Sequence, residues 1–201
     1  MVDPAPPIVN LRGDAVALGP FPPEQADAVA RWHNDYAVMR NWEFLPGPRP
    51  VASQRPAFEP GGFFSQPENA VFAIYQTTTW ELIGMTGLVH IDHVNRIAEF
   101  FIMIGAAQHR GRGYGTEATR LLLDHAFLGL GLLNVELRVF AYNLAGIRAY
   151  EKAGFRRIGV RHKSKLMGGR QWDTVLMEAL ADDFASPVLG RVLVPDPPRN
   201  G

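Results

Sequence analysis

The segment Gln108-His-Arg-Gly-Arg-Gly-Tyr-Gly-Thr116 constrains the fold and the ligand of this chain more than any other stretch. It follows the apolar run 97–105 and precedes a helical pattern, so it is predicted to connect a strand to a helix. Its alternating glycines leave bare backbone where a ligand must approach closely. A helix N-terminus offers unpaired N–H groups and the positive end of the helix dipole. The loop, with Arg110 and Arg112, therefore predicts a site for a phosphate-bearing ligand.

Two common phosphate-binding motifs do not fit this loop. A P-loop requires G-x-x-x-x-G-K-[ST], and the loop contains no lysine. The dinucleotide motif G-x-G-x-x-G fits Gly111 and Gly113 but places its last glycine at Thr116. An Arg-Gly-Arg-Gly peptide can bind RNA, but here it lies between apolar segments, and the net charge of zero argues against general nucleic-acid binding.

The hydrophobic pattern predicts one α/β domain over residues 11–182, preceded by a flexible N-terminus (1–10) and followed by a Pro-rich tail (183–201). Strands are predicted at 16–20, 70–76, 81–91, 97–105, 134–142, 155–165 and 171–180. Helices are predicted to start near 22 and 35 and to cover 115–130 and 144–153. The three strands between 70 and 105 form an antiparallel meander, and Gly168-Gly169 closes a hairpin. The Pro-rich stretch 46–66 is a candidate substrate lid.

Composition excludes some classes of site and leaves others open. The chain has no cysteine, which excludes disulfides and thiolate sites, and no apolar run long enough for a membrane span. We therefore expect a cytoplasmic protein that does not bind membranes. Residues 14–100 carry ten acidic against five basic residues, and residues 101–201 carry nine against fourteen. This asymmetry fits either two ligands of opposite charge or ordinary surface charge.

The loop does match Arg-x-x-Gly-x-Gly, and a second block, Asn143-Leu-Ala-Gly-Ile-Arg-Ala-Tyr-Glu-Lys-Ala-Gly-Phe155, follows it. Together they resemble the GNAT acetyltransferases, and Ala98-Glu99 with Gly113-Tyr-Gly-Thr-Glu-Ala118 resembles the ribosomal-protein and polyamine branch. The resemblance implies the GNAT fold, a mixed and mostly antiparallel seven-stranded sheet flanked by helices, with two neighbouring strands splayed apart. It also implies acetyl-CoA as cosubstrate and no metal.

By this resemblance, amides of the loop hold the pyrophosphate and the strand before the loop offers backbone groups to the pantetheine arm. Asn143 is predicted to cap the helix at 144–153, and by the resemblance its amide also binds the cofactor arm or orders a water there. The implied cofactor residues are Met103, Ile104, Gly105, Arg110, Gly111, Arg112, Gly113, Tyr114, Gly115, Thr116 and Asn143.

The resemblance places Tyr150 as the general acid that protonates the departing thiolate. Glu99, in an otherwise apolar strand, is a candidate general base, although Arg138 is a possible partner that would make it structural. His90 or His93 could serve as base instead. Because no fourth ligand accompanies His90, Asp92 and His93, a metal site is not expected.

The acceptor amine is the open question. The acidic, aromatic front half favours a small cationic amine. Two short segments, Thr86-Gly-Leu-Val-His-Ile-Asp-His93 and Ser186-Pro-Val-Leu189, resemble those of aminoglycoside acetyltransferases of the kasugamycin type, which implies antibiotic resistance. A protein N-terminus or a polyamine is the alternative acceptor, and a CoA-binding module without catalysis is a second alternative. A homodimer is possible. The candidate acceptor residues are Asp35, Trp42, Glu43, Asp92 and Glu99.

Overall fold

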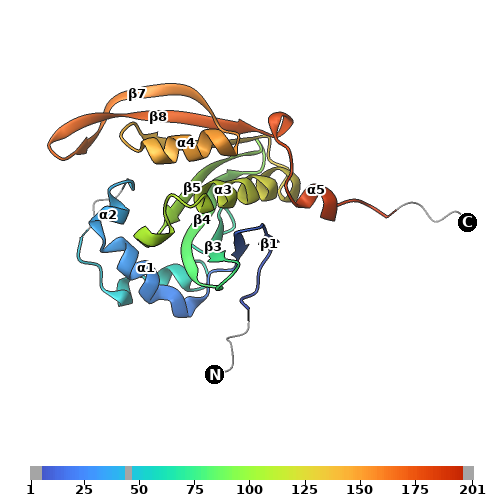
Figure 1. The fold of residues 1–201 in the computed structure, drawn as a ribbon, viewed down its shortest axis with the longest axis horizontal. Helices are drawn as coiled ribbons and strands as arrows, with labels where there is room; N and C mark the ends of the chain where they lie inside the picture. Colours follow the sequence, from blue (N-terminus) through green and yellow to red (C-terminus); the bar gives the residue numbers. More distant parts are fainter. Residues whose placement is uncertain (1–5, 44–46, 197–201) are drawn as a thin grey trace, which may run out of the picture.

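The computed structural model describes residues 6–43 and 47–196, and its centre is one eight-stranded sheet (Figure 1). The spatial order is β1-β2-β3-β4-β5-β6-β8-β7, and every neighbouring pair is antiparallel except β5 and β6. The strands are β1 (Leu11–Arg12), β2 (Val16–Gly19), β3 (Ala70–Gln76), β4 (Leu82–Asp92), β5 (Ile97–Ile104), β6 (Asn134–Phe140), β7 (Arg156–Met167) and β8 (Arg170–Leu180). The predicted mixed sheet is confirmed. It gains one strand because the two-residue β1, too short to show a pattern, folds back on β2.

Helices cover both faces of the sheet. The α-helices are α1 (Ala26–His33), α2 (Tyr36–Met39), α3 (Tyr114–Asp124), α4 (Leu144–Ala153) and α5 (Leu189–Val192), and a π-helical turn (His125–Gly129) extends α3. Helices α3 and α4 contact each other and pack on the larger apolar core, which includes Leu88, Phe100 and Leu122. Helix α1 covers the opposite face through a second core that includes Trp32 and Met103. The short 3₁₀ turns are Pro23–Gln25, Val51–Ser53, Arg55–Phe58, Ala107–His109 and Ala181–Asp183.

The parallel pair β5–β6 is paired over only three residues. Ile97–Glu99 lies opposite Asn134–Glu136, and beyond Glu99 the two strands separate, as the resemblance implied. On its other side β5 stays paired with β4 up to Ile104, and Gly105 N–H donates to Ile83 O at 2.9 Å. Because an antiparallel ladder alternates, the backbone groups of Ile102 and Ile104 face the gap between β5 and β6. The splay thus opens a slot at the centre of the sheet.

The predicted lid over 46–66 is a series of short turns attached to the α1 side. Phe58 and Phe64 pack on Phe21, with ring centroids 5.6 and 4.9 Å away. Residues 44–46 lie outside the described residues.

The C-terminal segment is anchored at one buried carboxylate. Asp124 Oδ2 accepts hydrogen bonds from Val188 N–H at 2.9 Å and Leu189 N–H at 2.8 Å, and both side chains pack against the main core. Val192 and Leu193 of the same predicted tail stay exposed. The predicted flexible N-terminus falls partly on residues 1–5, which lie outside the described residues. Within the described part of the chain, no helix is long and apolar enough to span a membrane.

Gly105 provides a test of how α1 packs on β5. A Cβ at Gly105 would lie 2.0 Å from Trp32 Nε1, so the indole can occupy its place only against a glycine. We expect Gly105→Ala to lower the free energy of unfolding by about 1–3 kcal/mol, measured by urea titration, because the buried indole must shift. The matched control is Gly159→Ala in β7, where the new Cβ meets Leu176 at 3.7 Å. Equal stability of the two variants would contradict this packing.

Candidate active site

The glycine loop has the backbone geometry that its sequence predicts. Gly111 and Gly113 have φ values of +72° and +86°, which are strained for other residues. Gly113 is the N-cap of α3 and makes no side-chain cap, so the N–H groups of the first turn have no intrahelical partner.

The space beside the loop is open. A Cβ added at Gly111 or Gly113 would meet nothing within 4 Å, and one at Gly115 would meet only Ile104 Cγ1 at 4.0 Å. Among the described residues the glycines are therefore not required by protein packing. Unpaired N–H groups at a helix N-terminus, facing open space, fit a pyrophosphate.

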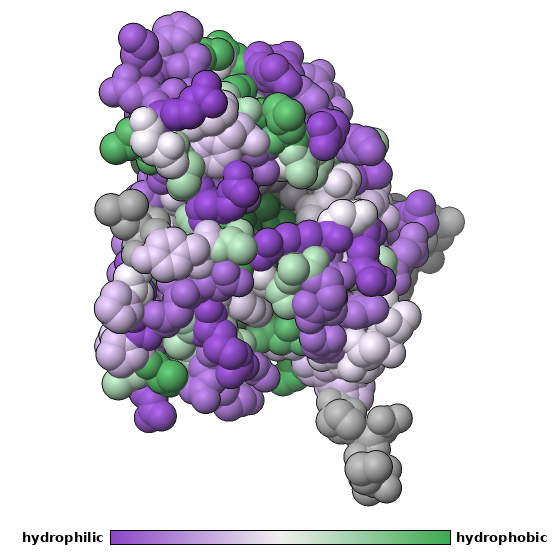
Figure 2. All heavy atoms as spheres, turned by 60° about the vertical axis from the view of Figure 1, so that its left-hand side comes forward, coloured by the Kyte–Doolittle hydropathy of each residue, from purple (hydrophilic) through white to green (hydrophobic). Residues whose placement is uncertain are grey.

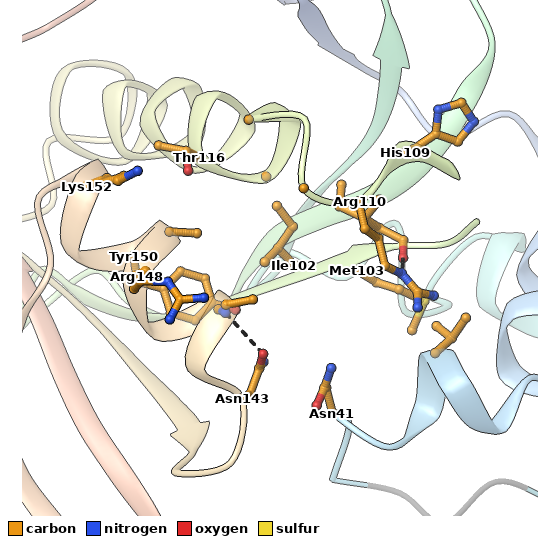
Figure 3. A pocket seen from close by; sticks show the side chains of 18 of the residues that line it. Asn41, Ile102, Met103, His109, Arg110, Thr116, Asn143, Arg148, Tyr150 and Lys152 are labelled. Carbon is orange, nitrogen blue, oxygen red and sulfur yellow. Dashed lines mark hydrogen bonds between the residues drawn. The ribbon is translucent and has the colours of Figure 1, made fainter. Parts of the chain in front are cut away.

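A cleft of about 440 Å³ extends from this loop along the slot between β5 and α4. Figure 3 shows the residues of β5 and the loop on one side and those of α4 on the other. Figure 2 shows the opening as a hollow with apolar side chains at its floor and mostly hydrophilic residues around it. Of the predicted cofactor residues, the cleft is lined by Met103, Ile104, Arg110, Gly111, Gly113, Gly115, Thr116 and Asn143.

The prediction for the end of β5 needs correction. Gly105 is outside the cleft lining, and its N–H is bound to Ile83 O. The backbone of Met103 likewise faces β4. Ile102, which was not predicted, lines the cleft, and its backbone faces the gap. Which residues of β5 direct their backbone groups toward the gap depends on the pairing of β5 with β4. The β5 sequence alone does not reveal this pairing.

The predicted phosphate contacts of Arg110 and Arg112 also need correction. Arg110 Nη2 donates to Gly105 O at 2.7 Å and its Nε to Ile104 O at 3.3 Å, so the guanidinium braces the loop against β5. Arg112 Nε donates to Gln108 O at 2.6 Å, and the side chain is outside the cleft lining. Tyr114 is buried and also outside it.

Two cations that the sequence analysis missed line the cleft from α4. Arg148 and Lys152 are one helical turn apart, so they lie on the same face of α4. Both are exposed, and Lys152 lies toward Thr116 of α3 in Figure 3. Their i, i+4 spacing within the predicted helix could have indicated that the two cations share one face. They place positive charge along the cleft opposite the loop.

Asn143 caps α4, as predicted. Its Oδ1 accepts a hydrogen bond from Gly146 N–H at 3.0 Å. The residue also lines the cleft, where Figure 3 shows it opposite Asn41. Capping fixes the side chain, so its amide group is held at the edge of the cleft.

Tyr150 extends from α4 to the floor of the cleft. Its ring packs edge-on against Phe100, with centroids 5.8 Å apart. Burial raises the pKa of Tyr150 to about 12 because an apolar environment disfavours the phenolate. The hydroxyl therefore keeps its proton at neutral pH, which a proton donor requires. It is also a weaker acid than a free phenol.

A second cavity of about 410 Å³ meets the cleft at Tyr150. Asn41, Trp42 and Ile102 also line both. The carboxylates of the second cavity are Glu43, Glu68 and Glu99, and its aromatic residues include Trp42, Phe63, Phe100 and Phe101. Trp42 and Phe63 each pack on Phe101, with centroids 5.7 and 6.0 Å away. The second cavity thus has an aromatic lining and joins the floor of the cleft at Tyr150.

Glu99 forms an ion pair with Arg138. This is the structural role that the sequence analysis gave as the alternative to a general base. Arg138 Nη2 lies 2.7 Å from Glu99 Oε1, and Arg138 Nη1 lies 3.0 Å from Glu43 Oε1. The guanidinium therefore bridges two carboxylates of the second cavity. Arg138 Nε also donates to Glu99 Oε1 at 2.8 Å, so this oxygen is occupied and the geometry suits Glu99 to charge and positioning more than to proton abstraction.

Two predicted acceptor residues lie outside both cavities. Asp35 caps α2, accepting a hydrogen bond from Ala37 N–H at 2.8 Å. Asp92 accepts hydrogen bonds from Val94 and Asn95 N–H in the β4–β5 turn, which lower its pKa. Both carboxylates satisfy local backbone donors, the usual use of Asp at caps and turns.

The histidines also differ in whether they line a cavity. His93 lies in the exposed β4–β5 turn, whereas His90 lines the second cavity. His109 is buried and its Nε2 lies 3.1 Å from Glu81 Oε1. No group of three His, Asp or Glu residues within 6–43 and 47–196 is placed to hold a metal ion.

Residues 40–43 form a strap where the two cavities meet, and side chains from the far half of the sheet hold it. Lys165 Nζ donates to Trp42 O at 2.9 Å, Tyr142 donates its hydroxyl hydrogen to Arg40 O, and Arg138 pairs with Glu43. Lys165 also lies over the Phe140 ring at 4.4 Å. These contacts join α2 to the β6–β8–β7 side across the splay.

Comparison with known proteins agrees with this geometry. The model of the acetyltransferase (GNAT) domain matches residues 16–156, and the chain belongs to this family. The fold is similar to a crystal structure of spermidine N-acetyltransferase from Vibrio cholerae in complex with CoA and spermine, with a TM-score of 0.77 and 23% identity over 85% of this chain and 98% of that one.

Curated relatives match over shorter segments. The spermidine N(1)-acetyltransferase of Vibrio cholerae is 32% identical over 103 residues, 51% of this chain and 59% of the relative. A Bacillus subtilis protein named "Probable N-acetyltransferase YjcK" is 33% identical over 112 residues, 56% of this chain and 62% of the relative. The matched segment thus spans about six tenths of the length of these relatives.

The cleft cations provide a direct test. We expect the double variant Arg148→Gln/Lys152→Gln to weaken CoA binding about tenfold or more, measured by calorimetry, because charge-assisted hydrogen bonds to phosphate contribute about 1.5–3 kcal/mol each. The matched control is Arg112→Gln, whose guanidinium is held by Gln108 outside the cleft. Stronger weakening by Arg112→Gln than by the double variant would contradict this assignment.

Proposed function

We propose that this protein transfers the acetyl group of acetyl-CoA to a primary amine of a small polycation of the polyamine type. One observation carries the proposal: the cleft beside the glycine loop and an acidic, aromatic cavity meet at the side chain of Tyr150, which lines both. Family membership supports acyl transfer. The spermidine acetyltransferase relatives favour a polyamine over the aminoglycoside acceptor that the sequence analysis placed first.

The chain's own residues would divide the binding of acetyl-CoA between two elements. The loop amides and Arg148 with Lys152 would hold the phosphates, while Ile102 and Ile104 backbone groups and Asn143 would hold the arm. Acetyl-CoA supplies an activated thioester carbonyl. Tyr150, with its proton retained by a pKa of about 12, would donate to the sulfur as the amine displaces it.

The second cavity has the chemistry of a polyamine site. Its lining has three carboxylates against the single guanidinium of Arg138, which leaves net negative charge. Ammonium groups are also attracted to the faces of aromatic rings such as Trp42 and Phe101. A flexible polycation can place one terminal amine at Tyr150 and the others among the carboxylates.

Removal of the Tyr150 hydroxyl should separate catalysis from binding. We expect Tyr150→Phe to lower kcat by about a hundredfold, the usual contribution of a general acid, and to leave the Kd for CoA unchanged. Because the pKa of Tyr150 is about 12, any limb of the wild-type rate profile below pH 9 belongs to another group and should persist in the variant. Turnover equal to wild type across that range would exclude Tyr150 as the acid.

The acceptor class can be tested by release of CoA thiol. With acetyl-CoA present, we expect spermidine and spermine to give higher kcat/KM than aminoglycosides or N-terminal peptides. Glu68→Gln should raise the KM for spermidine severalfold and leave the KM for acetyl-CoA unchanged, because Glu68 lines only the second cavity. Glu59→Gln, on an exposed turn outside both cavities, is the matched control.

Each other outcome of the panel identifies a different function. Preference for aminoglycosides would indicate an antibiotic-resistance acetyltransferase, and preference for peptides would indicate a protein N-terminal acetyltransferase. Tight CoA binding with no thiol release for any amine would leave a CoA-binding module.

A further inference from the structure

Strand β4 contains one extra residue beside the second cavity. Val89 lies opposite Glu99 and Asp92 lies opposite Ile97, so three steps along β4 match two along β5. This is a β-bulge, which shifts the alternation of side chains on the bulged strand. In a regular strand His90 would point to the opposite face from Val89. In this strand Val89 and His90 both line the second cavity, and Ile91 packs against the main core.

The bulge holds His90 in a costly backbone conformation. Its φ is +52°, in the left-handed region where residues other than glycine are uncommon. The next residue is fixed by a hydrogen bond from Ile91 N–H to Glu68 O at 3.0 Å. Such strain persists where the surroundings determine it, and it concentrates at functional sites. Glycine would relieve it, yet the chain has an imidazole here.

We propose that His90 is the general base that removes a proton from the acceptor ammonium. This inference rests on the proposed function. His90 is the only histidine among the described residues that lines the second cavity, and its neighbour Glu99 is occupied by Arg138. The other charged and titratable groups that line this cavity are Glu68 before β3, Glu99 on β5, Arg138 on β6, Glu43 of the strap and Tyr150 on α4, and Asp92 and His93 follow His90 in the chain.

Every proton of the proposed acetyl transfer is accounted for. His90 accepts one proton from the ammonium, directly or across one water, and the free amine forms the N–C bond to the thioester carbonyl as the C–S bond breaks. Tyr150 gives its proton to the sulfur and recovers one from the new amide nitrogen. The products are the N-acetyl amine and CoA thiol, with one proton released from His90 to solvent.

The first test is the pH dependence of kcat/KM for spermidine with saturating acetyl-CoA, from pH 5.5 to 9. Wild type should lose rate on the acidic side of the profile, because a protonated imidazole cannot accept the proton of the ammonium. We expect His90→Gln to lower kcat/KM about a hundredfold at pH 8, to remove this limb, and to bind CoA normally. His93→Gln, three residues further along and in the exposed turn, is the matched control and should retain the wild-type profile.

The second test uses the strained backbone. His90→Gly should raise Tm by about 2–4 °C while lowering kcat/KM as much as His90→Gln does. The matched control is Lys163→Gly, at an exposed bulge of β7 with φ +51°, whose N–H bond to Asp173 does not need the side chain. Lys163→Gly should raise Tm similarly and leave kcat/KM unchanged.

The outcomes separate this proposal from the function beneath it. A His90→Gln enzyme that turns over spermidine with the wild-type acidic limb would overturn His90 as base and leave the acetyltransferase intact. A wild-type protein that releases no thiol with any amine would overturn the proposed function and, with it, the base.

Discussion

The short parallel pairing of β5 with β6 is the constraint on which the site depends. Three residues of each strand are joined, and the strands then separate while β4–β5 and β6–β8 continue. The separation leaves backbone donors and acceptors of β5 without a strand partner, and buried backbone groups of this kind need one. It also leaves room for the cleft that Tyr150 and Asn143 line from α4 and its cap.

The contacts around the splay keep it open and determine its two ends. Arg110 braces the glycine loop against the end of β5, so the first turn of α3 faces the cleft. On the other side, Lys165 of β7 and Arg138 of β6 hold the strap at 40–43 across the splay. One end therefore has cations and free amides, and the other has carboxylates and aromatic rings. This polarity matches an anionic acyl donor and a cationic acceptor.

Much of the site was predictable because its determinants are local. The alternating glycines, the cap at Asn143 and the position of Tyr150 each depend on a few neighbouring residues, and the structure places them at one cleft. The strands and helices followed from hydrophobic period for the same reason, whereas β1 was too short to carry a pattern. The π-helical turn after α3 was predicted as ordinary helix because both have similar spacing.

What the sequence could not give depends on partners distant in the chain. Asp35 and Asp92 were indistinguishable from Glu43 as exposed acids until their local hydrogen bonds were known. Arg110 and Arg112 had the right charge, but carbonyls near them hold their guanidinium groups. The orientation of His90 follows from the pairing of β4 with β5, which no pattern within β4 reveals.

The central claim is that the open space at the first turn of α3 belongs to the phosphates of CoA. It is tested most directly by calorimetric titration of Gly115→Leu with CoA, alongside its Tm. Gly115 lies in α3, where leucine is a better helix former than glycine, and a Cβ added there would meet only Ile104 Cγ1, in ordinary contact at 4.0 Å. The account predicts a Tm at or above wild type with CoA binding at least tenfold weaker, whereas Arg120→Leu on the exposed face of α3 binds CoA normally. Wild-type affinity in a folded Gly115→Leu protein would contradict the account.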